Sequence, residues 1–151
     1  MDNSLREESE KGMKDHTFII IKPNAVKRGL IGKIIARIEN KGLKIIALKL
    51  LRLTRSQAEN LYEMHRNKPF FGYLINHITS DFIVAMVIEG KEAIKVMRKM
   101  AGTTNPTEAA FGTIRGDFGL SITENVIHAA DNKENTLREM KICFTSEEIL
   151  S

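Results

Sequence analysis

Four stretches of this sequence have the length and composition of β-strands. Residues 82–88 contain only apolar side chains, which is typical of a strand that is buried on both faces and lies inside a sheet. An apolar run at residues 17–22 stops where Pro23 follows, and residues 43–53 are rich in Ile and Leu. Together with residues 117–123, these runs predict strands at spacings that leave room for a helix between successive members.

Helical patterns fill the intervals. Apolar residues three and four positions apart predict a helix over residues 31–42, which ends at a glycine suited to a helix C-terminus. Thr54 followed by Gln57 has the sequence of a capping box, so a helix is expected to begin there. Further helices are expected over residues 70–78 and 93–102 and after Asn132. The alternation indicates an α/β sandwich and leaves the strand order open.

Length and composition fit one globular domain. The chain has 151 residues, of which 42% are hydrophobic and 28% are charged, and no stretch approaches the ~20 apolar residues that span a bilayer. The single cysteine cannot form an internal disulfide. Residues 1–15 are polar and aperiodic, so we expect a disordered extension there, without the pattern of a secretory signal, followed by one domain over residues 16–151.

The charge of the chain favours anionic partners. Residues 1–16 hold three of the 23 basic and five of the 19 acidic side chains, so the remainder carries a net charge of +6. Nucleotides, nucleic acids and phosphorylated metabolites would all suit such a surface.

One histidine and several cations are candidates for chemistry. His128 closes an Asn-Val-Ile-His segment that we expect just after the last strand, and an imidazole there could act as a nucleophile or a general base. Arg115 lies in a turn near glycines and could bind phosphate oxygens. Arg98, Thr104 and Lys22 are placed to reach the same region. Each of these residues taken singly is more often an ordinary surface side chain, and His16, His65 and His77 are expected to be solvated or packed.

Two common nucleotide-binding motifs are missing. The sequence contains neither the Gly-rich P-loop nor the Gly-x-Gly-x-x-Gly turn of dinucleotide-binding folds. It also lacks a cluster of metal ligands at zinc spacing.

Taken together, the segments resemble those of a nucleoside diphosphate kinase, in the family's order and spacing from about residue 16 to the end. The most specific are Gly-Thr-Ile-Arg-Gly-Asp-Phe at residues 112–118 and Asn-Val-Ile-His at residues 125–128. The others are Ile21-Lys22-Pro23, Arg28-Gly29, Lys41-Gly42, Pro69-Phe70-Phe71, Ala85-Met86-Val87, Glu89-Gly90, Gly102 and Thr104-Asn105-Pro106.

The resemblance implies a fold and a reaction. The fold is a ferredoxin-like βαββαβ core (an α/β fold of the α+β kind), with a four-stranded antiparallel sheet flanked by helices, in place of the parallel sheet that alternation alone favours. The reaction is Mg²⁺-dependent transfer of the γ-phosphoryl group of a nucleoside triphosphate to a nucleoside diphosphate, by a ping-pong mechanism through a phosphohistidine. It would maintain NTP and dNTP pools in the cytoplasm. The family also implies a homo-oligomer, a tetramer or hexamer built from dimers, with no membrane or specific nucleic acid as partner.

The resemblance also assigns roles to residues. His128 matches the nucleophile and Glu139 the carboxylate that orients it. Phe70 matches the ring that stacks on the base, and Mg²⁺ is expected to be held mainly by the nucleotide phosphates, with no protein metal site. The remaining matches are substrate-binding residues: Arg98, Thr104 and Arg115 for the phosphates, Lys22 and Asn125 near the ribose hydroxyls and phosphates, and Tyr62 beside that lysine.

One segment departs from the family. After the catalytic histidine the family usually has Gly-Ser-Asp, whereas this chain has Ala129-Ala130-Asp131. The serine hydroxyl near the His–Glu pair is therefore missing, and Ala129 would be strained if its position required a positive φ. This departure leaves a second interpretation, in which a catalytically weakened member acts as a nucleotide-binding or scaffold protein. A nucleic-acid-binding protein is a third interpretation, although the chain lacks basic patches interleaved with aromatic residues.

Overall fold

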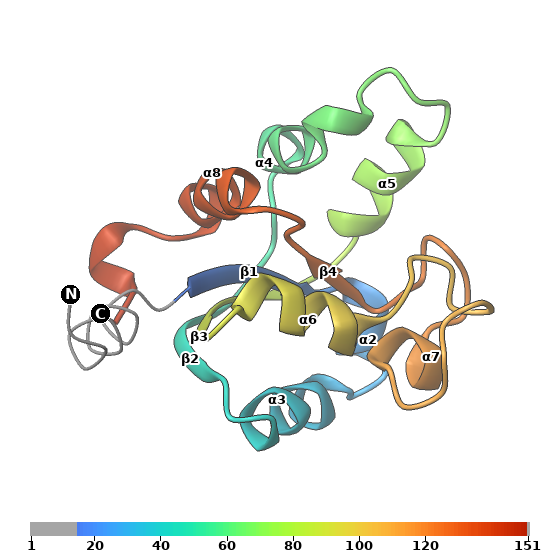
Figure 1. The fold of residues 1–151 in the computed structure, drawn as a ribbon. Coiled ribbons are helices and arrows are strands. Elements are labelled where there is room, and N and C mark those ends of the chain that lie inside the picture. Colours follow the sequence, from blue (N-terminus) through green and yellow to red (C-terminus); the bar gives the residue numbers. More distant parts are fainter. Residues whose placement is uncertain (1–14, 151) are drawn as a thin grey trace, which may run out of the picture.

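A four-stranded antiparallel sheet forms the centre of the molecule. The computed structural model describes residues 15–150, and its sheet has the order β2-β3-β1-β4 (Figure 1). The strands are β1 (Asp15–Ile21), β2 (Lys44–Leu51), β3 (Ile83–Gly90) and β4 (Ile127–Ala129). This arrangement confirms the ferredoxin-like sheet, and β3 is an interior strand, as its apolar sequence predicted.

Helices lie on both faces of the sheet (Figure 1). No helix within residues 15–150 is long and apolar enough to span a membrane. The α-helices are α2 (Pro23–Lys27), α3 (Ile31–Asn40), α4 (Arg55–Leu61), α5 (Phe71–Ile78), α6 (Ala93–Ala101), α7 (Ile114–Phe118) and α8 (Lys133–Cys143), and the 3₁₀ turns are η1 (Glu63–His65) and η2 (Ser146–Glu148).

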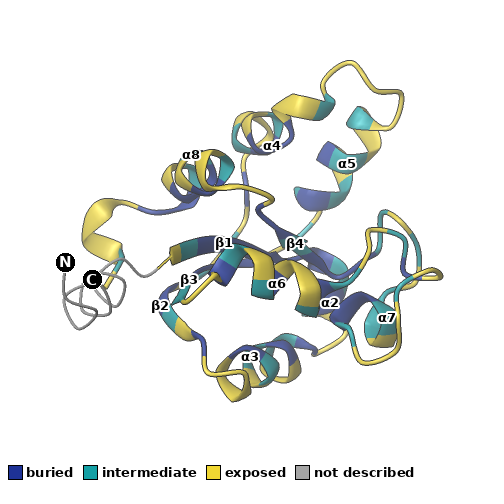
Figure 2. Cartoon of the chain, in the orientation of Figure 1, coloured by how far each residue is buried: buried dark blue, intermediate teal, exposed yellow. Residues whose placement is uncertain are grey.

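Alternation along β1 divides the interior into two cores. Figure 2 shows that buried residues occur in the sheet and in the helices that cover it. Phe18 and Ile20 pack with buried residues of α4, α5 and α8 on one face of the sheet. Ile19 and Ile21 pack with α2, α3, α6 and α7 on the other face. Each face thus buries every second side chain of the strand, as the pleat requires. The sheet holds the two helical layers in place relative to one another.

Local capping fixes several helix ends as the sequence predicted. Thr54 and Gln57 form a reciprocal capping box at the start of α4. The side chain of Asn132 accepts a hydrogen bond of 2.7 Å from the amide of Asn135 and begins α8. Both residues satisfy amides that lack a partner within their helix.

The predicted strand over residues 117–123 is wrong. The chain forms α7 at Ile114–Phe118 instead, because the Thr113 hydroxyl caps the Gly116 amide at 3.0 Å and Asp117 accepts a hydrogen bond from the Gly112 amide at 2.9 Å. The fourth strand is β4, so His128 lies within a strand and not after it.

The N-terminal prediction lies largely outside the described residues. The disordered extension was expected over residues 1–15, and of these the structure describes only Asp15, with which β1 begins.

Candidate active site

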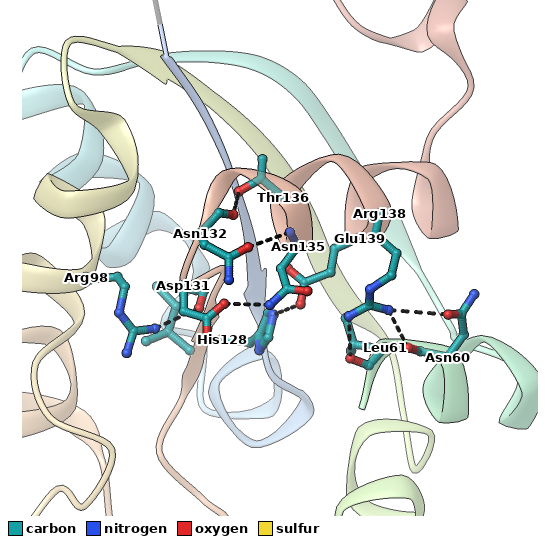
Figure 3. Close-up of polar contacts among 12 residues, drawn as sticks. Asn60, Leu61, Arg98, His128, Asp131, Asn132, Asn135, Thr136, Arg138 and Glu139 are labelled. Atoms are coloured by element: carbon teal, nitrogen blue, oxygen red, sulfur yellow. Dashed lines mark hydrogen bonds and ion pairs between the residues drawn. The ribbon is translucent and has the colours of Figure 1, made fainter. Parts of the chain in front are cut away.

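A histidine–glutamate pair lies where β4 meets α8. His128 pairs with Ile20 of β1 in the sheet register, and its side chain is 16% exposed. Its Nε2 lies 2.9 Å from Oε1 of Glu139, whose side chain is 1% exposed (Figure 3). A carboxylate only accepts hydrogen bonds, so this contact places the proton on Nε2 and leaves the Nδ1 lone pair free. The pair therefore presents an oriented, nucleophilic nitrogen.

Two aromatic rings fix the orientation of the imidazole. Tyr62, which follows α4, meets the His128 ring edge-on with ring centres 6.0 Å apart. Phe18 of β1 meets it at 6.4 Å in a similar edge contact. Burial raises the pKa of the Tyr62 hydroxyl, and the nearby Glu139 carboxylate raises it further, so this ring is neutral at physiological pH. The imidazole is thus held by packing as well as by its hydrogen bond.

The carbonyl groups on either side of His128 hold two arginines. Arg115 of α7 is buried and donates to the carbonyl oxygens of Ile127 at 2.9 Å and Gly102 at 2.8 Å. Arg98 of α6 donates to the carbonyl oxygen of Ala129 at 3.2 Å (Figure 3). Burial lowers the pKa of Arg115 to about 10, and the positive charge of Arg98 contributes. Two guanidinium groups therefore flank the histidine, where they can bind phosphate oxygens.

A buried lysine adds a third positive charge. Lys22 follows β1 and is 5% exposed. Burial lowers its pKa to about 7, and the positive charge of Arg115 lowers it too. Burial and the neighbouring guanidinium group both disfavour the charged form of the ammonium group.

An asparagine links this cluster to the loop before α7. Asn125 is 2% exposed and its Nδ2 donates to the carbonyl oxygen of Thr104 at 3.2 Å. Its Oδ1 is buried without a hydrogen-bond partner among the described residues. Since buried polar atoms are usually paired, this oxygen is an acceptor available to a ligand.

These side chains open into one cavity of about 540 Å³. Phe70, just before α5, forms part of its mouth with 44% of its surface exposed. The volume falls in the range of small-molecule sites. The structure brings together all nine site residues that the sequence predicted: Lys22, Tyr62, Phe70, Arg98, Thr104, Arg115, Asn125, His128 and Glu139.

Sequence reasoning missed several residues that line this cavity. His65 lies with its ring centre 5.6 Å from that of Phe70, and burial lowers its pKa, so the ring is neutral at pH 7. The only hint in the sequence was that His65 lies five residues before Phe70, the residue expected to stack on the base. The other lining residues are Met64, Leu74, Ile122, Thr123, Ala129 and Asp131.

Helix α8 contacts both His128 and the C-terminal end of α4. Next to Glu139, Arg138 donates to the carbonyl oxygen of Asn60 at 2.5 Å, at the C-terminal end of α4 (Figure 3). Asn135 of the same helix donates to Asp131 at 2.7 Å. One helix thus contacts His128 through Glu139 and also contacts the end of α4, the helix that leads to Tyr62.

The Ala129-Ala130 segment has one consequence that was expected and one that was not. Oε2 of Glu139 is buried without a hydrogen-bond partner among the described residues, as the missing serine hydroxyl suggested. Ala129, however, does not have a positive φ, so the expected strain at this position is absent. Ala129 has an ordinary strand conformation in β4.

We therefore expect Ala130→Ser to stabilise the protein. A hydroxyl that donates to Glu139 Oε2 contributes about 0.5–1.5 kcal/mol, which would raise the thermal midpoint by about 1–6 °C. Calorimetry of the two proteins measures this change. Ala129→Gly is the control and should lower the midpoint, because glycine gains no relief where φ is negative. A serine variant no more stable than the parent would contradict the assignment.

Comparisons with known proteins agree with this geometry. The family model for nucleoside diphosphate kinase matches residues 15–149. Nucleoside diphosphate kinases of Archaeoglobus fulgidus and Hyperthermus butylicus are 53% and 57% identical over 137 and 136 residues, which are 91% and 90% of this chain and 91% and 96% of theirs.

Solved structures agree as well. The enzyme of Halobacterium salinarum in complex with CDP has a TM-score of 0.89 at 40% identity, covering 92% of this chain and 93% of that chain. The enzyme of Aquifex aeolicus has a TM-score of 0.89 at 39% identity, covering 91% of this chain and 100% of that chain. The matches extend over the whole sheet and all the residues of the cavity, and the chain belongs to the nucleoside diphosphate kinase family.

Proposed function

We propose that His128 carries the phosphoryl group between a nucleoside triphosphate and a nucleoside diphosphate. The observation that supports this assignment is the 2.9 Å contact of Nε2 with buried Glu139, at a cavity that also contains Lys22, Arg98 and Arg115. The alternative of a weakened, merely nucleotide-binding member is not favoured, because the relatives at 53–57% identity bear the name of the enzyme.

The first half-reaction forms a phosphohistidine. The Nδ1 lone pair attacks the γ-phosphorus, the Nδ1–P bond forms, and the bond to the bridging oxygen breaks, so the diphosphate leaves with that electron pair. Positive charge that develops on the imidazole is stabilised through Nε2–H by the Glu139 carboxylate. The second half-reaction reverses these steps with a different diphosphate. The side chains of Lys22, Arg98 and Arg115 stabilise the negative charge of the phosphate oxygens as that charge shifts during transfer.

Base recognition is assigned to Phe70. Stacking on an aromatic face tolerates any base, because each base offers a π-face. The complex of the Halobacterium salinarum relative with CDP supports nucleotide binding in this fold.

The test of the proposed function is an exchange assay. With ATP as donor, purine and pyrimidine diphosphates should all be converted to triphosphates, at efficiencies that differ modestly. Discrimination of about 10⁴ or more in favour of one base would contradict the stacking assignment, because that magnitude requires hydrogen bonds to the base edge. A chain that converts none would contradict the function.

Mg²⁺ is proposed to enter with the nucleotide. The cavity is lined by three cations and by the carboxylates of Asp131 and Glu139, of which Glu139 contacts His128. The excess of cations suits phosphate oxygens better than a bare metal ion. Within residues 15–150 no group of three His, Cys, Asp or Glu side chains could hold a metal. A Mg²⁺ ion bound to the phosphates would neutralise part of their charge. Arg98, Arg115 and Lys22 would bind the remaining oxygens.

Lys22 gives the reaction a pH dependence. In the protein without bound nucleotide, the Lys22 side chain has a pKa of about 7, so it loses its charge as the pH rises above 7. A bound polyphosphate favours the charged form, so binding takes up a proton and weakens as the pH rises. We expect the KM for the diphosphate to increase about tenfold between pH 7 and 8.5.

Lys22→Arg is the matched control for this dependence. Arginine stays charged throughout that range, so the KM of the variant should be nearly constant between pH 7 and 8.5. Equal pH profiles in the two proteins would show that another group controls binding.

Assembly and location complete the proposal. β2 forms an edge of the sheet, and Leu48 and Leu50 on it are 55% and 60% exposed. An edge strand with exposed leucines suits pairing with a second copy, so we propose dimers as the unit of a tetramer or hexamer. Light scattering should then give an even multiple of the 17.1 kDa chain mass.

We propose residues 16–151 as the kinase domain. We also propose that the protein is located in the cytoplasm, which holds the nucleotide pools.

A further inference from the structure

The backbone is strained two residues before His128. Val126 has a φ of +67°, a region that residues with a branched β-carbon very rarely adopt. Its side chain is fully buried. Within residues 15–150, the other non-glycine residue with positive φ is Glu92, which is unbranched and exposed. Val126 is therefore in a strained backbone conformation, because it is both branched at the β-carbon and fully buried.

A hydrogen bond defines this strained segment as a γ-turn. The amide of Ile127 donates to the carbonyl oxygen of Asn125 at 2.9 Å, which closes a three-residue turn around Val126. A γ-turn with positive φ at its centre is the rarer and more strained of the two forms. Such a conformation persists only where the surrounding structure holds it in place.

The surroundings of the turn are the substrate-binding residues. The amide of Lys22 donates to the carbonyl oxygen of Val126 at 2.9 Å. Arg115 donates to the carbonyl oxygen of Ile127, also at 2.9 Å, and Asn125 donates to Thr104 at 3.2 Å. The three consecutive residues 125–127 thus contact three of the predicted site residues and include a fourth, Asn125, and His128 comes next in the chain.

A change of φ at Val126 from positive to negative would rotate the preceding peptide unit. The Asn125 side chain and the Ile127 carbonyl could not then both keep their partners, because the turn fixes their relative direction. The buried valine side chain packs in the core that also contains Ile114 of α7 and Met97 of α6. This branched side chain has few χ1 rotamers, so this packing limits how far the backbone at Val126 can move.

We propose that the γ-turn at Val126 is a positioning element for phosphoryl transfer. The strained backbone sets Asn125 and Arg115 at fixed positions relative to the His128 ring. Val126 itself acts through these groups and does not touch the reacting atoms. The inference rests on the proposed role of His128 as phosphoryl carrier.

The test compares substitutions at Val126 with a matched valine in the same core. Val126→Gly removes the buried side chain, and glycine adopts positive and negative φ about equally, so the backbone at this position is no longer restricted to one conformation. We expect the single-turnover rate of His128 phosphorylation by Mg-ATP to fall about 10- to 100-fold, since small misplacements of reacting groups have effects of this size. Measured at saturating Mg-ATP, this rate reports phosphoryl transfer apart from binding, and the KM for ATP is expected to rise as well, because the turn also holds Arg115 and Lys22.

Val84 of β3 provides the control. It is also buried, at 3% exposure, and belongs to the same core. Val126→Ala and Val84→Ala delete the same atoms, and thermal unfolding measures the loss of stability in each. We expect a rate decrease of about fivefold or more in Val126→Ala and a parental rate in Val84→Ala.

The outcomes separate this inference from the proposed function. A parent chain that forms no phosphohistidine overturns the function before any variant is made. With an active parent, a folded Val126→Gly protein that is phosphorylated at the parental rate overturns the positioning role. Should Val126→Gly fail to fold, the alanine pair decides: equal rates in Val126→Ala and Val84→Ala overturn it, and a loss confined to Val126→Ala supports it.

Discussion

His128→Ala is expected to form no phosphoenzyme. Incubation of the parent with Mg-ATP without an acceptor should give one phosphoryl group per chain, labile in acid and stable in alkali, and a diphosphate should remove it as the matching triphosphate. The alanine variant lacks the attacking nitrogen, so its exchange rate should fall by about 10⁴-fold or more. The contact of Nε2 with Glu139 leaves Nδ1 as the atom that carries the label. Peptide mapping should locate the label on the segment that holds His128.

His65→Ala is the matched control for this experiment. His65 lines the same cavity, and its ring lies beside Phe70 without a carboxylate partner among the described residues. Its removal should weaken nucleotide binding but leave the label on the chain. Label that persists in His128→Ala, or that maps to a serine or threonine, would contradict the mechanism.

Periodicity predicted most elements because each depended on local features. The apolar run at residues 82–88 became the interior strand β3, and the Thr54–Gln57 box begins α4. Antiparallel strand order was available only from the family resemblance, because alternation of elements is the same in parallel and antiparallel arrangements. The short helix α2 was missed, since Pro23 after an apolar run indicates the end of a strand as well as the start of a helix.

The site was predictable in its residues but not in its geometry. The motifs identified nine residues of the cavity, yet no sequence pattern indicates that Val126 has a positive φ, because valine strongly favours the extended region. The segment around Asp117 was predicted as a strand, but the Thr113 hydroxyl caps it as a helix. Asp117 also pairs with Arg37 at 2.6 Å, eighty positions away, a contact that no local pattern predicts.

The short fourth strand links the fold to the reaction. β4 is three residues long and forms the sheet edge opposite β2. One side of it pairs with β1, while the carbonyl groups of Ile127 and Ala129 bind Arg115 and Arg98. In an interior strand, these carbonyl groups would accept hydrogen bonds from a second neighbouring strand. An edge position therefore allows two guanidinium groups to flank His128.

Glu139→Gln is expected to keep the phosphohistidine but form it slowly. The amide can still contact Nε2, yet it carries no negative charge to stabilise the imidazolium that develops during attack. Loss of one such electrostatic contact in a buried site typically slows a reaction by about 10²–10³-fold. Rapid-quench measurement of the label after mixing with Mg-ATP gives the rate, and the final level of label should remain near one per chain.

Arg138→Gln separates this electrostatic effect from a general disturbance of α8. The two residues are adjacent on the helix and both substitutions remove one charge, but Arg138 contacts the end of α4 and not the imidazole. We expect its rate of label formation to stay within about threefold of the parent, because Arg138 contacts only oxygens of Asn60 and Leu61 and neither the imidazole nor its carboxylate partner. Equal slowing in the two variants would assign the effect to the helix. A Glu139→Gln protein labelled at the parental rate would show that Nε2 needs no carboxylate, and that the nucleophile is oriented by Tyr62 and Phe18 alone.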